Sequence, residues 1–362
     1  TTKLNSRSIK FRKINNDQEL LRVEQIKKSC ESCRNSYFGT GIELDLDIKS
    51  EAEVTELDNG LLYRINVQSE DAFGISFHFD EYMLPAQSSL FLFNEDRSTV
   101  LGAFTHINNH PSKKFSTIII PGDKITIEYF EAFNAEFEGQ LNLKRITHAF
   151  VDVYSGAYTA NSNQAERTES ECYIDVNCSE GDDFQILKKA VCRIAYWDED
   201  FNLNGHCSGF LVNTNNPLKP AYVLTSAHCT SPGYTGGSEP KQRYQDWVFE
   251  FDYESALCGL GAKVPLNTHN GSFVVTGAHP LLDKGDYLLL DLQLNNIEDF
   301  LDVTRLGWYR GTSGVFDTRG ISHPEGLPKK IARASTNSIA DRYRTGSLSG
   351  MDMFWNVTWS NG

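Results

Sequence analysis

Residues 222–229 read Tyr-Val-Leu-Thr-Ser-Ala-His-Cys, and this octet decides how the second half of the chain is interpreted. Its apolar start predicts a buried β-strand, and the small residues that follow predict a turn. The turn places His228 beside Cys229, so that the strand end would hold the imidazole and a disulfide would pin the loop. A buried structural histidine next to a disulfide is the alternative. The match over the whole octet favours a catalytic general base.

A candidate partner for this histidine lies further along, in Gly285-Asp286-Tyr287-Leu288-Leu289-Leu290. A catalytic aspartate orients the histidine ring and stabilises its cation, and Asp286 stands at the start of an apolar strand that can anchor it. An ordinary turn aspartate is the alternative, since turns commonly contain Asp. The order of His228 before Asp286 is that of chymotrypsin-type serine proteases, which favours the catalytic interpretation.

The sequence offers no convincing nucleophile for this pair. A nucleophilic serine needs a glycine-rich loop whose backbone N–H groups can form an oxyanion hole. The Gly-x-Ser-Gly pattern occurs at Gly311-Thr312-Ser313-Gly314, which follows Asp286 too soon for the strands that should intervene. Ser349-Gly350 is the other candidate, but most Ser-Gly pairs are simply turns.

Strand-like patterns also dominate the first half of the chain. Residues 42–48 alternate strictly between apolar and polar, which predicts a half-buried strand, and a short helix is predicted over 19–28. Further strand-like runs, separated by turn residues, lie at 61–67, 74–79, 89–93, 116–120 and 124–130. Many short strands at regular spacing predict a β-sandwich.

The composition divides the chain into four parts. Residues 1–40 form a polar N-terminal arm, and residues 41–155 contain the predicted sandwich. Residues 156–171 have almost no large apolar side chain, which is typical of a linker. A second β-rich part, denser in Cys and Trp, occupies residues 172–362. The predicted fold class is therefore all-β.

Charge and cysteine content narrow the class of function. The 362 residues carry a formal net charge of -14 at pH 7, which would repel nucleic-acid phosphates. We find no run of about 18 apolar residues and expect no membrane span. The eight cysteines are Cys30, Cys33, Cys172, Cys178, Cys192, Cys207, Cys229 and Cys258. Their local grouping predicts a disulfide framework and hence a secreted or cell-surface protein.

A metal site is the rival interpretation of the cysteines. A zinc ribbon requires two paired CxxC knuckles, and only Cys30 and Cys33 have that spacing. His106 and His110 stand four apart but lack the Glu of a zinc-protease helix, and the residues around them predict a turn. We therefore expect no metal and no cofactor.

Several segments within residues 172–362 resemble the lysyl endopeptidase family, in the family's own order. They are Cys172–Asp182, the octet 222–229, Val248–Cys258, the strand that begins at Asp286, Leu306–Tyr309, Ile321–Gly326 and Lys329–Ile331. The resemblance implies a chymotrypsin-like double β-barrel with His228 as general base and Asp286 as the residue that orients it. The N-terminal sandwich resembles, more loosely, the pro-regions that precede such catalytic domains.

The resemblance also implies two disulfides. It pairs Cys207 with Cys229 and Cys178 with Cys258. The family's partner for Cys172 would lie beyond the end of this chain. Cys172 and Cys192 pair with each other, or Cys192 is a buried free thiol; the sequence leaves both open, together with the pairing of Cys30 and Cys33.

The same resemblance places the nucleophile outside the chain. It identifies residues 354–359 as the strand just before the nucleophile loop, so that the serine would lie beyond Gly362 and Ser313 comes too early. The second barrel is then expected to be incomplete at its C-terminus. The resemblance further implies activation by cleavage within residues 156–171, between Arg167 and Thr168, which would release the 41–155 pro-domain.

The sequence thus predicts the precursor of a secreted serine endopeptidase that cleaves proteins after a basic residue, Lys by the resemblance. Its partners would be protein or peptide substrates and its own pro-domain. A catalytically inactive, protease-like binding protein or complex subunit is the main alternative, and a chain that naturally stops at Gly362 would favour it. An adhesion or complex subunit working through the sandwich is the other, and a sandwich that binds a surface partner by itself would favour it.

Overall fold

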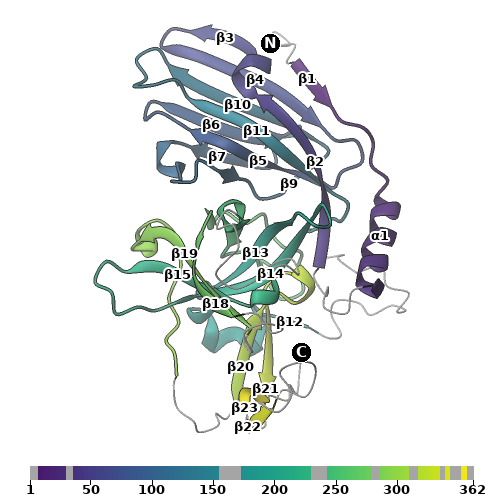
Figure 1. Ribbon diagram of the computed structural model, residues 1–362, viewed down its shortest axis with the longest axis vertical. Coiled ribbons are helices and arrows are strands. Elements are labelled where there is room, and N and C mark those ends of the chain that lie inside the picture. The colour runs from purple at the N-terminus through teal and green to yellow at the C-terminus, as the bar shows by residue number, and fades with distance from the viewer. Residues whose placement is uncertain are drawn as a thin grey trace. The chain divides into compact units, whose positions relative to one another are not determined.

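The computed structural model describes residues 7–29, 36–154, 173–229, 243–278, 286–309, 317–334, 339–342 and 352–356 (Figure 1). These residues form mostly short strands, so the predicted all-β class is confirmed. The chain divides into two compact units. The N-terminal unit comprises Thr1–Gln25, Phe38–Asp152 and Asn202–Asn204, and the C-terminal unit comprises Ile26–Tyr37, Val153–Phe201 and Gly205–Gly362.

One sheet of the N-terminal unit has six strands. Its order is β1 (Arg7–Lys10), β4 (Gly60–Gln68), β10 (Lys124–Ala132), β6 (Ser88–Asn94) and β7 (Val100–Phe104), and β3 (Glu53–Leu57) also pairs with β4. Alternate residues of β4 and β10 are buried, including Ile65, Val67, Ile125 and Ile127. This period of two means that one face of the sheet packs on a core while the other meets solvent.

A second set of strands faces the same core. Its order is β2 (Ser36–Asp47), β11 (Gln140–Ala149), β5 (Gly74–Met83) and β8 (Phe115–Ser116), and β9 (Ile120–Pro121) also pairs with β5. The rings of Phe104 in β7 and Phe115 in β8 have centroids 4.8 Å apart, which joins the two sheets. The unit is therefore a sandwich, as the sequence predicted.

Two predicted elements of this unit differ in the structure. The run 116–120 is not one strand, because Ile118, Ile119 and Ile120 are all buried and the chain leaves the ladder between β8 and β9. The predicted strand 42–48 begins earlier, at Ser36, and ends at Asp47, whose carboxylate caps the short helix α2 (Ile48–Glu51) by accepting from Ser50 N at 2.7 Å. The predicted helix at 19–28 is α1 (Asn16–Ser29).

The C-terminal unit contains a nearly closed, barrel-shaped antiparallel sheet. Its strands follow the order β17 (Thr268–Asn270), β16 (Val248–Glu250), β13 (Val191–Asp198), β14 (Leu203–Val212), β15 (Pro220–Thr225), β19 (Tyr287–Asn295) and β18 (Phe273–Ala278). A Cβ at Gly209 in β14 would lie 2.8 Å from Ile194 Cδ1 and 2.9 Å from Val223 Cγ1. Glycine is thus required where β13, β14 and β15 pack together.

Smaller sheets follow the barrel strands. β12 (Ile174–Asp175), β21 (Lys330–Ala334) and β20 (Thr318–Ser322) form one, and β22 (Ile339–Arg342) pairs with β23 (Asp352–Asn356) in another. Short 3-10 helices connect the strands, among them η3 (Ser179–Phe184), η4 (Leu187–Ala190), η5 (Ala227–Cys229), η6 (Arg243–Asp246), η7 (Ile297–Asp299) and η8 (Pro324–Gly326). No helix in the described part of the chain is long and apolar enough to span a bilayer.

An ion pair is buried in the middle of the C-terminal unit. Arg193 Nε donates to Glu250 Oε2 at 2.6 Å, and the two side chains are 0% and 2% exposed. The guanidinium lies 3.3 Å from the ring centroid of Tyr253 and also donates to the carbonyl oxygen of Gly326 at 3.1 Å. Burial of a charge away from water costs free energy, and this cost is offset only while the oppositely charged partner is present.

Replacing Arg193 by Met should therefore destabilise the protein strongly, because Glu250 would be left buried without its cation. We expect the free energy of unfolding to fall by about 3–5 kcal/mol, measured by urea denaturation followed by tryptophan fluorescence. Lys189→Met is the control, since it breaks an exposed pair with Asp302 and should change stability by less than about 1 kcal/mol. Equal effects of the two substitutions would contradict this account.

Candidate active site

The register of two strands brings His228 and Asp286 together. β15 and β19 are antiparallel, with Thr225 opposite Leu288 and Leu224 opposite Leu289. The residues that follow β15 and those that precede β19 therefore lie at the same end of the barrel sheet. His228 comes three residues after Thr225, and Asp286 two residues before Leu288.

Buried neighbours hold His228 at this end. Ala227 and Cys229, on either side of it in η5, are 0% and 1% exposed, whereas the His228 side chain is 52% exposed. Cys229 forms a disulfide with Cys207 of β14, and Thr225 Oγ1 donates to the carbonyl oxygen of Ser208 at 2.7 Å. The turn is thereby tied to β14 while the imidazole remains accessible.

The carboxylate of Asp286 contacts the histidine twice. His228 Nδ1 and Asp286 Oδ2 are 2.7 Å apart, and the backbone N–H of His228 donates to Asp286 Oδ1 at 3.1 Å. Because a carboxylate accepts, this contact assigns the ring proton to Nδ1 and leaves Nε2 unprotonated in the neutral imidazole. Within the described residues Nε2 has no hydrogen-bond partner, so it is available as a base.

The environment keeps Asp286 ionised. Its partial burial would by itself raise the pKa of the carboxyl, but hydrogen bonds from the His228 ring and from the backbone of His228 and Ala227 outweigh burial and lower the pKa below its ordinary value. An ionised Asp286 fixes the ring orientation and stabilises the imidazolium that forms when Nε2 takes a proton.

The cysteines outside this turn have different states. Cys178 forms a disulfide with Cys258, so both disulfides in the described residues are the pairs that the family resemblance implies. Cys192 is a buried free thiol, and burial raises its pKa to about 12. Cys30, Cys33 and Cys172 lie outside the described residues.

The site is unsuited to a metal ion. The side chains of Cys207, His228 and Cys229 lie close enough together to resemble a ligand set. The two cysteines are joined in a disulfide and offer no thiolate, and the histidine's Nδ1 is already bound to Asp286. The other histidines considered as ligands are in the N-terminal unit, where His110 Nδ1 lies 2.7 Å from Ser112 Oγ and His106 is exposed.

Some positions singled out in the sequence lie outside the described residues. They are Arg167 and Thr168 of the predicted cleavage site, the rest of the linker 156–171, Ser313 and Ser349. Sequence reasoning did not find the contact between Thr225 and Ser208, which positions the histidine turn. No local sequence pattern predicts this hydrogen bond, because its two residues lie in different strands, β15 and β14.

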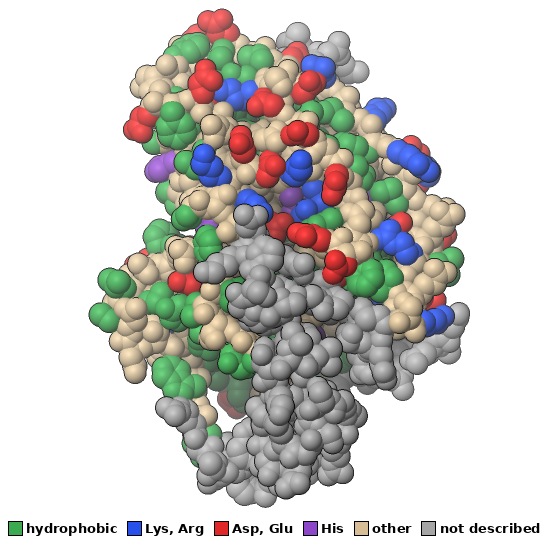
Figure 2. Space-filling model, viewed as in Figure 1, with side chains coloured by type: hydrophobic (Ala, Val, Ile, Leu, Met, Phe, Trp, Pro, Cys, Tyr) green, Lys and Arg blue, Asp and Glu red, His purple; other side chains and the backbone are tan. Residues whose placement is uncertain are grey.

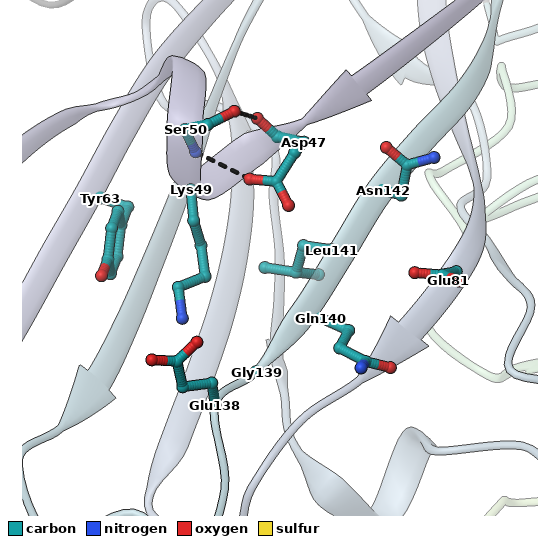
Figure 3. Close-up of a pocket in the computed structure, with 10 residues that line it drawn as sticks. All are labelled: Asp47, Lys49, Ser50, Tyr63, Glu81, Glu138, Gly139, Gln140, Leu141 and Asn142. Atoms are coloured by element: carbon teal, nitrogen blue, oxygen red, sulfur yellow. Dashed lines mark hydrogen bonds between the residues drawn. The ribbon is translucent and has the colours of Figure 1, made fainter.

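A separate hollow of about 510 Å³ lies in the N-terminal unit (Figure 3). Its lining includes Asp47, Glu81 and Glu138, and also Lys49, which pairs with Glu131 at 3.0 Å. Figure 3 shows the Asp47 carboxylate turned toward Ser50, from whose backbone N–H it accepts a hydrogen bond. None of the candidate catalytic residues lines this hollow, so it is distinct from the site formed by His228 and Asp286.

A β-barrel sheet that presents a half-exposed histidine, bound through Nδ1 to an ionised aspartate, is typical of the trypsin-like serine peptidases. The comparison with known families agrees with this class. The family model described as "Lysyl endopeptidase, C-terminal domain" matches residues 167–362, more than half of the chain. The chain belongs to this family.

The lowered pKa of Asp286 predicts how stability changes with pH. The ionised Asp286 carboxylate stabilises the folded state. This stabilisation is fully present above the unfolded-state pKa of the carboxyl, about 3.9, and is lost as the pH falls through its lower folded-state pKa. Asp286→Asn removes the titrating group, so its free energy of unfolding should fall less than that of the unaltered protein between about pH 5 and pH 3. Urea denaturation at each pH measures this difference.

Asp299→Asn is the matched control for this experiment, because Asp299 is exposed and remote in sequence from the histidine turn. It should keep the pH dependence of the unaltered protein. A pH dependence of Asp286→Asn that coincides with that of the control would show that the Asp286 carboxylate gains nothing from His228.

Proposed function

We propose that this protein is the precursor of a secreted serine endopeptidase. The observation that carries the proposal is the hydrogen-bonded pair of His228 and Asp286, which leaves Nε2 free on an accessible imidazole. Membership of the lysyl endopeptidase family supports the same reaction class. On the face shown in Figure 2, acidic and basic side chains are interspersed over the N-terminal unit, so nothing there favours a nucleic-acid partner.

In the proposed reaction, a serine Oγ attacks the scissile carbonyl carbon while His228 Nε2 takes the hydroxyl proton. Asp286 stabilises the resulting imidazolium, which then gives the proton to the leaving amine. Water completes the cycle by attacking the acyl-enzyme, with His228 again acting as base. We place the nucleophilic serine beyond Gly362, as the family resemblance implies, and not at Ser313.

The proposed substrates are proteins and peptides cut after lysine. The support is the family description together with a net charge of -14, which attracts basic polypeptides and repels acidic ones. Secretion is supported by the two disulfides among the described residues of the C-terminal unit, since such bonds persist in oxidising compartments.

We further propose that the N-terminal sandwich, residues 41–155, acts as a pro-domain. It would assist folding of the catalytic part or hold it inactive until the chain is cut between Arg167 and Thr168. The support is the loose resemblance to pro-regions and the linker composition of residues 156–171. Intact protein through this linker that is fully active would contradict the proposal.

Removing either member of the catalytic pair should abolish most of the activity. We expect His228→Ala and Asp286→Asn each to lower kcat by about 10⁴-fold on a peptide ester or amide, because the base is lost or its tautomer is no longer fixed. The measurement is steady-state hydrolysis by the natural, full-length protein after processing. His106→Ala and Asp299→Asn, at exposed positions outside the pair, should stay within about twofold.

Peptides that differ only in the residue before the cut test the substrate class. The family assignment predicts a kcat/KM for Lys that exceeds the value for Arg by about tenfold or more, and still larger ratios over uncharged residues. Equal rates for Lys and Arg would indicate general trypsin-like specificity. A correctly folded, processed protein that cleaves no peptide would instead favour the inactive, binding-protein alternative.

A further inference from the structure

β12, the first strand after the predicted linker 156–171, is held in place by backbone hydrogen bonds. β12 is antiparallel to β21, with Ile174 opposite Ile331 and Asp175 opposite Lys330. The N–H of Val176 then donates to the carbonyl oxygen of Lys329 at 3.2 Å, and the Val176 side chain is fully buried. This segment follows directly on residues 155–172, which connect the two β-rich parts of the chain.

A buried carboxylate locks the same strand. Asp175 is 6% exposed, and its Oδ1 lies 2.5 Å from Lys330 Nζ, which is itself buried. Ser255 Oγ donates to the same carboxylate at 3.1 Å, and the N–H of Gly259 donates at 2.7 Å. Both oxygens of Asp175 are therefore satisfied by donors of its own unit.

Two further ties act on the residues that follow. The disulfide between Cys178 and Cys258 joins this segment covalently to the loop that carries Ser255 and Gly259. Asn177 Nδ2 donates to the carbonyl oxygen of Ser255 at 2.6 Å. The strand, the loop and the buried ion pair thus form one cross-linked unit.

The identity of the cation has a consequence for activation. A peptidase precursor can use the α-amino group created by cleavage as the cation for a buried carboxylate, and its catalytic part is then ordered only after cleavage. Here Lys330, a side chain of the same unit, already supplies the charge that Asp175 requires. The hydrogen bond between His228 and Asp286 lies in the same unit as this ion pair.

We propose that the Asp175–Lys330 pair is an internal anchor that fixes β12 independently of cleavage of the linker. Because Lys330 already pairs with Asp175, the α-amino group that cleavage creates is not required as the cation of this carboxylate. This inference rests on the proposed peptidase function for its consequence, but the anchor itself is testable without activity.

Hydrogen exchange tests the anchor directly. Amide exchange of a peptide spanning residues 173–181 is measured by mass spectrometry in the uncut full-length protein and in the processed protein. We expect rates that agree within about twofold, since the strand's hydrogen bonds are the same in both forms. Exchange that slows tenfold or more after processing would show that cleavage orders the strand, and would overturn the proposal.

Substitution of the cation provides the second arm. Lys330→Met should speed exchange of residues 173–181 in the uncut protein by about tenfold or more, because Asp175 is left buried and unpaired. The double variant Asp175→Asn/Lys330→Met should recover part of the protection, and Lys189→Met should leave it unchanged. If Lys330→Met leaves the exchange of residues 173–181 unchanged, the ion pair does not anchor the strand and the proposal is wrong.

Activity supplies the third arm. A cleavage site for a second protease is placed at either of two positions in residues 156–171, so that processing leaves N-termini of different length. We expect kcat/KM values within about twofold of each other, whereas an α-amino group that had to reach a buried carboxylate would lose about 100-fold when misplaced. The exchange rates can match the expectation while neither processed form cleaves peptides. That result would contradict the peptidase function and leave the anchor supported.

Discussion

The pairing register between β15 and β19 is the constraint on which the site depends. Thr225 lies opposite Leu288, so the turn after β15 lies beside the residues that precede β19. This strand pairing is sufficient to bring His228 into contact with Asp286. Val223 and Leu290, also opposite each other, are both fully buried. A slip by one residue would turn these side chains out of the core, so hydrophobic burial fixes the register and thereby the geometry of the His228–Asp286 pair.

Two disulfides also stabilise the C-terminal unit around this site. The Cys207–Cys229 disulfide holds the histidine turn against β14, and the Cys178–Cys258 disulfide holds the segment after β12 against the loop that contains Cys258. Both leave the His228 side chain half exposed. The buried ion pair of Asp175 and Lys330 adds an electrostatic anchor between β12 and β21. All of these contacts join residues within the C-terminal unit.

Sequence patterns predicted what is local or shared with a family. Alternation at residues 42–48 indicated β2, and the octet at 222–229 indicated the histidine turn. The run 116–120 was predicted wrongly as one strand, because three consecutive buried isoleucines carry no period of two. The Asp175–Lys330 pair was not predicted, since an ion pair between distant residues leaves no mark in either segment. The catalytic roles themselves stay predictions.

The most direct test of the central claim is covalent labelling of the natural, processed protein with a fluorophosphonate serine-hydrolase probe, followed by peptide mapping. If the proposed mechanism holds, we expect a single labelled serine, located after Gly362 in the full protein, and loss of labelling in His228→Ala. A folded, processed protein that the probe does not label would contradict a serine peptidase mechanism and leave the pair of His228 and Asp286 without a nucleophile to activate.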